Sequence, residues 1–197
     1  EAELGKLQDS LAAQRSEVEQ MLADAQAMDA ASAEAARIAS AQTQLALLRS
    51  ALDSGNSYAA SAQELAGLGV ELPAALSGPA ESGVATLSAL RDRFAPAARE
   101  ALATAREETK AGGSLLDYVN RQLGARSVTP KEGDDPDAVL SRAEAAVAAG
   151  KLQDALNELA ALPEAARSAL SSWEAAANAR VAAMTAAADL AQSLQAK

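Results

Sequence analysis

The chain has 197 residues, of which 49% are hydrophobic but only 2% are aromatic, and it contains neither cysteine nor histidine. Without cysteine there are no disulfide bonds and no thiolate metal sites. Without histidine, the usual zinc sites and the Ser-His-Asp and Cys-His catalytic arrangements are excluded. The formal net charge of −10 argues against nucleic acid as a partner, because phosphate binding needs a basic face. We therefore expect a protein that is not an enzyme and holds no cofactor or metal.

Alanine supplies much of the hydrophobic content, and it is the strongest helix former while burying little area per residue. No segment shows the alternation of β-branched and aromatic residues that is typical of strands. The sequence therefore predicts an all-α fold, a helical bundle with a long N-terminal coiled-coil-like helix and a C-terminal helical hairpin followed by a long last helix. We expect three regions: a helical extension over 1–36, an amphipathic helix with short helices over 37–82, and a bundle over 83–197.

Residues 1–36 carry a heptad repeat of the kind found in coiled coils. Large apolar residues occupy six a and d positions of one frame, namely Leu4, Leu7, Leu11, Val18, Met21 and Met28. Gln14 and Ala25 fill the remaining a and d positions and weaken the seam. The pattern favours the end of a longer coiled coil over an ordinary amphipathic helix.

A second apolar stripe follows, out of phase with the first. It contains Ile38, Ala41, Leu45, Leu48 and Leu52, with Arg37 and Arg49 beside it, and the helix is expected to end at Gly55. Lying flat on a bilayer, such a stripe inserts shallowly, although its flanking basicity is weak; turned inward, it forms part of a core. Both alternatives stay open, and the candidate membrane-binding residues are Arg37, Ile38, Leu45, Leu48, Arg49 and Leu52.

The middle of the chain is predicted to hold a short helix over about 57–66, a stretch of turns, and a helix that Thr86 caps and that ends near residue 111. Pro96 is expected to kink or restart that helix, and a further helix is expected from Ser114 to Gly124. Eight cations between Arg91 and Lys131, partly offset by five carboxylates, give this region a mildly positive balance. The candidate patch residues among them are Arg91, Arg93, Arg99 and Arg106. They indicate either a patch for lipid headgroups or an acidic partner, or else a solvated face with i,i+4 ion pairs.

Toward the C-terminus, two helices over about 137–149 and 151–162 are predicted to form a hairpin hinged at Gly150, and the last helix follows Pro163. Small residues in this pair indicate close helix packing, either within a bundle or around a peptide-binding groove. The single tryptophan, Trp173, is interpreted as a core anchor rather than an exposed contact. The candidate residues for the bundle core or a dimer contact are Leu140, Leu156 and Trp173.

Four carboxylates gather just before this hairpin, at Glu132, Asp134, Asp135 and Asp137. Hard cations prefer such ligands, but the spacing is not that of an EF-hand loop. Asp135 followed by Pro136 matches the start of a helix. We therefore favour capping and solvation over a metal site.

Taken in order, several segments resemble the C-terminal part of mitofilin in its alphaproteobacterial form. The first are residues 48–55 (LRSALDSG) and 64–65, followed by 83–87 (GVATL) with Leu90, Arg93 and Phe94. The most specific are residues 137–144 (DAVLSRAE), 150–152 (GKL) and 155–156, with Leu162 and Trp173. The resemblance covers about residues 38–188, and the heptads before it look like the end of that family's coiled coil.

Mitofilin is the membrane-shaping subunit of the cristae-junction organising complex. The resemblance implies a non-enzymatic scaffold of the bacterial inner membrane, whose coiled coil and mitofilin-type bundle (83–197) lie in the periplasm. It further implies self-association, which we expect to give a homodimer. It also implies binding to phospholipid membranes through an amphipathic helix, and other inner- or outer-membrane proteins as partners. The alternative function is a soluble adaptor that binds a protein through the hairpin around Gly150 and does not touch lipid.

Overall fold

The computed structural model describes residues 2–111 and 133–196, and every element of regular structure in them is a helix. The all-α prediction is confirmed, including the long first and last helices. The helices are α1 (Ala2–Ser54), α2 (Ala59–Gly67), α3 (Ala74–Ser77), α4 (Leu87–Ala111), α6 (Pro136–Ala148), α7 (Leu152–Leu159) and α8 (Glu164–Gln195). The helix predicted from Ser114 to Gly124 lies outside the described residues.

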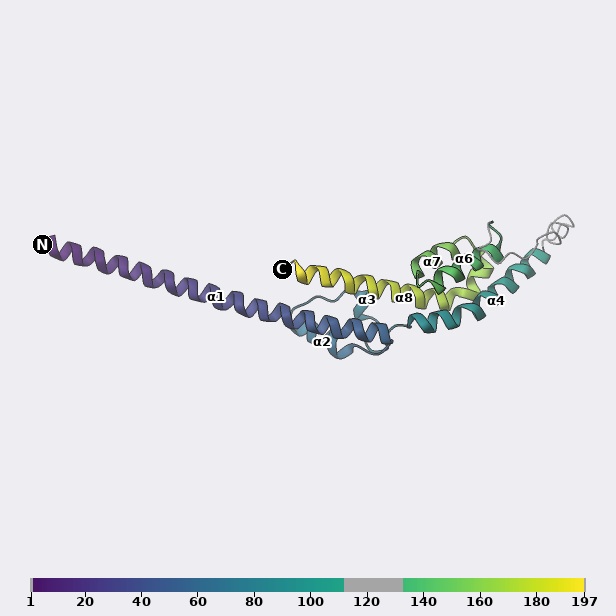
Figure 1. The fold of residues 1–197 in the computed structure, drawn as a ribbon, viewed down its shortest axis with the longest axis horizontal. Helices are drawn as coiled ribbons and strands as arrows, with labels where there is room; N and C mark the ends of the chain where they lie inside the picture. The colour runs from purple at the N-terminus through teal and green to yellow at the C-terminus, as the bar shows by residue number, and fades with distance from the viewer. Residues whose placement is uncertain (1, 112–132, 197) are drawn as a thin grey trace.

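Helix α8 is shared by two hydrophobic cores, so the molecule is long rather than round (Figure 1). In its first half α8 packs with α4, α6 and α7 around a cluster that we call core A. In its second half it packs with α1, α2 and α3 around a cluster that we call core B. Because α8 contributes Leu170 and Trp173 to one core and Ala183 and Ala187 to the other, it acts as the spine of the fold.

Core A is organised around two aromatic side chains. Trp173 and Phe94 are fully buried and meet edge to face, with ring centroids 4.9 Å apart. The Trp173 indole Nε1 donates to the Leu90 carbonyl oxygen at 2.8 Å, which gives the buried ring its polar partner. The interpretation of Trp173 as a core anchor is confirmed. Leu140 is also buried in core A, and Leu156 packs against it half-buried.

The α6–α7 hairpin is held by its caps and by small residues. The Asp135 carboxylate accepts from the backbone N–H groups of Asp137 and Ala138, at 3.1 Å each, as predicted for an N-cap. Gly150 adopts a positive φ of 78° at the hinge, a conformation that glycine adopts without strain. Ala143 and Ala155 are buried inside core A. The small residues of the hairpin therefore serve its own packing.

Between α1 and α4 the chain makes a closed excursion that carries α2 and α3. The two ends of the excursion cross at Gly55 and Gly83, where a Cβ on Gly83 would lie 2.6 Å from the Gly55 carbonyl oxygen. Both glycines have positive φ, as predicted for Gly55. Thr86 then caps α4, since its Oγ1 accepts from the Ala89 N–H at 3.1 Å. Pro96 lies inside α4 and does not end it.

Candidate interaction surfaces

The first half of α1 projects away from the bundle, and nothing else in the described chain packs on it (Figure 1). It keeps large apolar side chains in contact with solvent, with exposed fractions between 51% and 75%. These residues are Leu4, Leu7, Leu11, Val18, Met21, Leu22 and Met28. All six large apolar residues of the predicted heptad seam are among them. A row of large apolar side chains on one helix face, interrupted only at Gln14 and Ala25, indicates an interaction surface rather than scattered exposure.

The membrane-binding assignment of Leu45, Leu48 and Leu52 is wrong for this fold. Their exposed fractions are 3%, 0% and 0%, and they form the α1 side of core B. Helices α2 and α8 cover this face of α1, because burying it against apolar side chains is more favourable than leaving it in water. Ile38, at the edge of the stripe, is half-buried. The alternative reading, in which the stripe belongs to the core, is the one that the structure supports.

Arg37, expected beside lipid, instead holds the end of a neighbouring helix. Its guanidinium donates to the carbonyl oxygen of Leu68, the C-cap residue of α2. It also pairs with the Glu34 carboxylate, and that hydrogen bond raises the pKa of Arg37 above its ordinary value. A cation at a helix C-terminus satisfies free carbonyl groups and interacts favourably with the helix dipole.

Arg91 plays the same part for α6. Its Nε and one terminal nitrogen donate to the carbonyl oxygens of Val147 and Ala148, at 3.2 and 2.7 Å. The three other predicted patch residues, Arg93, Arg99 and Arg106, are exposed. At about 100° per residue, Arg99 and Arg106 share one face of α4, while Arg93 lies roughly 130° away from them. The four arginines therefore do not make one continuous patch.

Arg180 makes a structural contact that the sequence analysis did not predict. It lies on α8 between the two cores, is only 8% exposed, and donates to the carbonyl oxygens of Leu52 and Ala85, at 3.0 and 3.1 Å. It also contacts the Asp53 carboxylate at 3.4 Å. One side chain thus joins the end of α1, the segment before α4, and α8. The signal in the sequence is an arginine three residues after Ala177, in line with the apolar face of the last helix.

Tyr58 contributes an unsatisfied polar group to core B. Its side chain is buried, and its hydroxyl has no hydrogen-bond partner among the described residues. Burial also raises the pKa of this hydroxyl. A buried hydroxyl without a partner costs about 1–3 kcal/mol.

We expect Tyr58→Phe to raise the free energy of unfolding by about 1 kcal/mol at pH 8, because it removes this unsatisfied group. The raised pKa sets the pH dependence: ionisation of Tyr58 does not change stability below its unfolded pKa of about 10, and it lowers the stability of the wild type as pH rises from there toward the folded pKa. The variant should therefore lose less stability than the wild type above about pH 10. Urea unfolding at both pH values measures this, and a less stable variant at pH 8 would show that the hydroxyl does have a partner.

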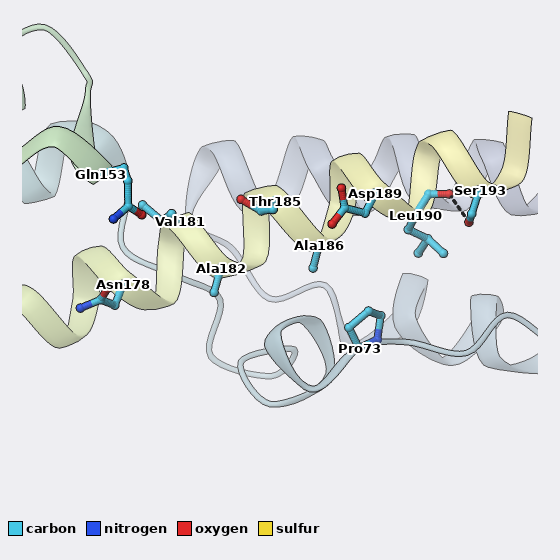
Figure 2. Close-up of a pocket in the computed structure, with 10 residues that line it drawn as sticks. All are labelled: Pro73, Gln153, Asn178, Val181, Ala182, Thr185, Ala186, Asp189, Leu190 and Ser193. Carbon is cyan, nitrogen blue, oxygen red and sulfur yellow. Dashed lines mark hydrogen bonds between the residues drawn. The ribbon is translucent and has the colours of Figure 1, made fainter. Parts of the chain in front are cut away.

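A shallow groove of about 640 Å³ runs along the outer side of α8 (Figure 2). Its residues are Pro73, Gln153, Asn178, Val181, Ala182, Thr185, Ala186, Asp189, Leu190 and Ser193. The hairpin contributes Gln153 to one end, and Pro73 contributes from the segment before α3. Ser193 Oγ donates to the Leu190 carbonyl oxygen at 2.8 Å, so part of its polar lining is already paired within the helix.

Within the described ranges, no group of carboxylates is placed to hold a metal ion; Glu132, one of the four predicted carboxylates, lies outside them. Over residues 2–111 and 133–196, no helix is both long and apolar enough to cross a bilayer. Comparison of the chain with protein-family models, with curated proteins and with solved structures gives no match. The resemblance to mitofilin therefore stays a prediction that rests on the residues quoted for it.

Proposed function

We propose that this protein is a non-enzymatic scaffold that self-associates through α1 and presents its helical bundle at a membrane. The observation that carries the proposal is the exposed apolar stripe from Leu4 to Met28 on a helix that leaves the bundle. A helix with one unpartnered apolar seam in heptad spacing is stable in water mainly when another helix covers that seam. A second copy of the chain carries the same seam and is the simplest occupant.

The size of the stripe supports a specific contact. Six large side chains on the seam and Leu22 beside it each expose on the order of 100 Å², which sets an upper limit of about 700 Å² per partner, of the same order as the roughly 800 Å² per partner of a standard protein interface. The seam spans 25 residues from Leu4 to Met28, or about 37 Å of helix. This length corresponds to between three and four heptads, which is enough for knobs-into-holes packing.

Self-association is tested by a seam variant with a matched control. We expect Leu11→Gln combined with Met21→Gln to convert an oligomer into a monomer, because both changes put polar groups into the seam while keeping good helix formers. The control, Ala23→Gln combined with Ala30→Gln, makes the same number of changes on the opposite, exposed face of α1. Light scattering coupled to size exclusion measures the mass. A wild-type monomer, or a seam variant with unchanged mass, would contradict the proposal.

The membrane part of the proposal is supported by the resemblance to mitofilin, which implies bending or bridging of the inner membrane. Since Leu45, Leu48 and Leu52 are buried, we place lipid contact elsewhere on the surface, on the face of α4 where the exposed Arg99 and Arg106 are available to headgroups. Co-sedimentation with vesicles that contain anionic lipid, at low and moderate salt, tests this. Protein that pellets only at low salt would support electrostatic contact. Protein that stays in the supernatant under both conditions would favour the soluble adaptor.

A further inference from the structure

Helix α1 carries two apolar stripes that point in different directions. The first runs from Leu4 to Met28 and is exposed, whereas the second, from Ala41 to Leu52, is buried in core B. At about 100° per residue, the mean directions of the two stripes differ by roughly 160°. Because α1 is one continuous helix from Ala2 to Ser54, the two stripes lie on nearly opposite sides of the same helix. The seam therefore faces away from the side on which the bundle is built.

The seam side of α1 also stays exposed in the second half of the helix, opposite core B, and we call this surface the back face. Continuing the heptad frame of the seam past Met28 reaches Ser32, Ala35, Ala39, Gln42 and Ala46, and all five are exposed. Four of them are small, so another helix can approach closely without meeting a bulky side chain. The helices that pack on α1, namely α2 and α8, do so on the side of Leu45 and Leu48. Gln42 Nε2 donates to the Leu194 carbonyl oxygen at the end of α8, at 3.5 Å, so α8 reaches the edge of this back face there. Ser32, Ala35, Ala39 and Ala46 remain exposed to a second helix.

We propose that a second copy of the chain binds with its α1 on this back face. The two α1 helices then form a shared stem, and the two bundles lie on opposite sides of it. This inference rests on the proposed self-association and specifies its geometry. It holds whether the two stems run parallel or antiparallel, since in either case each bundle lies on the far side of its own α1. Both bundles then keep their surfaces free, including the α8 groove and the exposed arginines of α4.

A dimer whose two bundles face outward is suited to bridging two surfaces. Two identical bundles that face outward can engage two surfaces, or two sites on one surface, at the same time, and the second contact benefits from a high effective concentration. If the pairing seam and the bundle shared one face of α1, the stem of one copy would cover the bundle of the other. The phase shift between the two stripes prevents this.

The chain has no cysteine, so single cysteine substitutions in the full chain report the geometry directly. Ala25→Cys lies in the seam, and Ala27→Cys lies two residues away on the side of α1 that continues the core B stripe; both positions are exposed in one copy. Ser171→Cys reports on the outer surface of α8. The readout is the rate of alkylation by a small thiol reagent, at protein concentrations well below and well above the dissociation constant of the pair.

At about 100 times that dissociation constant, we expect the Ala25→Cys thiol to react roughly tenfold more slowly than in the monomer. The Ala27→Cys and Ser171→Cys thiols should react at the monomer rate. Protection of Ala27→Cys or Ser171→Cys, or of none of the three in a chain that still pairs, would overturn the back-to-back geometry while leaving self-association intact. Absence of pairing at every concentration would instead overturn the proposed function on which the inference rests.

Discussion

Replacing Leu48 by aspartate is expected to unfold core B. The side chain is completely buried between α1, α2 and α8, so the change removes apolar contacts and also places a carboxylate where water cannot reach it. Loss of a buried leucine alone costs about 2–5 kcal/mol, and burial of an unpaired charge adds to this. Since natural domains are stable by only about 5–15 kcal/mol, we expect a loss of about 5 kcal/mol or more, seen as a lower midpoint in urea unfolding followed by circular dichroism.

The neighbouring leucine provides the control for this experiment. Leu47 is 55% exposed on the same turn of α1, and Leu47→Asp should change stability by no more than about 0.5 kcal/mol. The pair of variants separates the two roles considered for the stripe. If Leu48→Asp folded normally and lost only lipid binding, the stripe would be a membrane contact after all, and the packing described for core B would be wrong.

The second large effect is expected at Arg180. Arg180→Met keeps an apolar stem of similar length but removes the side-chain donor to the carbonyl oxygens of Leu52 and Ala85 at the junction of the two cores. The Leu52 oxygen then keeps only the long 3.4 Å bond from the Gly55 N–H. Each buried polar group that loses its partner costs about 1–3 kcal/mol. We expect a loss of about 2–4 kcal/mol in the free energy of unfolding, with part of it appearing as weaker coupling between core A and core B.

Arg167→Met on the same helix is the matched control, because the Arg167 side chain is 46% exposed and its ion pair with Glu174 has an N–O distance of 3.6 Å. The Glu174 side chain is only 16% exposed, but a long ion pair whose cation lies in water contributes only about 0–1 kcal/mol. Hydrogen exchange measured along α8 distinguishes a local effect from a global one. Equal losses for both variants would mean that the buried contacts of Arg180 do not hold the junction.

Short-range patterns in the sequence were sufficient to predict the main helices and several of their ends. Asp135 with Pro136 and Thr86 identified two helix starts, Gly55 identified a left-handed helix end, and Gly150 identified the hinge of the hairpin, because caps and turns depend on a few neighbouring residues. The anchor role of Trp173 followed from its size and its place on an apolar helix face. These features need no knowledge of which helix packs on which.

The sequence could not assign the two stripes of α1, because periodicity gives the direction of an apolar face but not what covers it. The stripe with Leu45 and Leu48 meets α8, whose contributing residues begin at Ala183, far along the chain. The expected positions of Arg37 and Arg91 on the surface were wrong for the same reason. Arg37 and Arg91 look like surface cations in the sequence, yet each reaches the C-terminus of a helix that only the tertiary fold brings near.

The sharing of α8 by two cores also has a consequence for the order of folding. Core A is built from residues 90–177, so its helices are close in sequence and can associate early, whereas core B joins residues 41–84 to residues 183–194. Contacts such as that between Gln42 and Leu194 close a loop of about 150 residues, and long loops carry a larger entropic cost before any contact forms. During synthesis, the base from which α1 projects is therefore completed only when the last helix has emerged. Two copies that associated through their α1 helices before that point would pair before core B had formed.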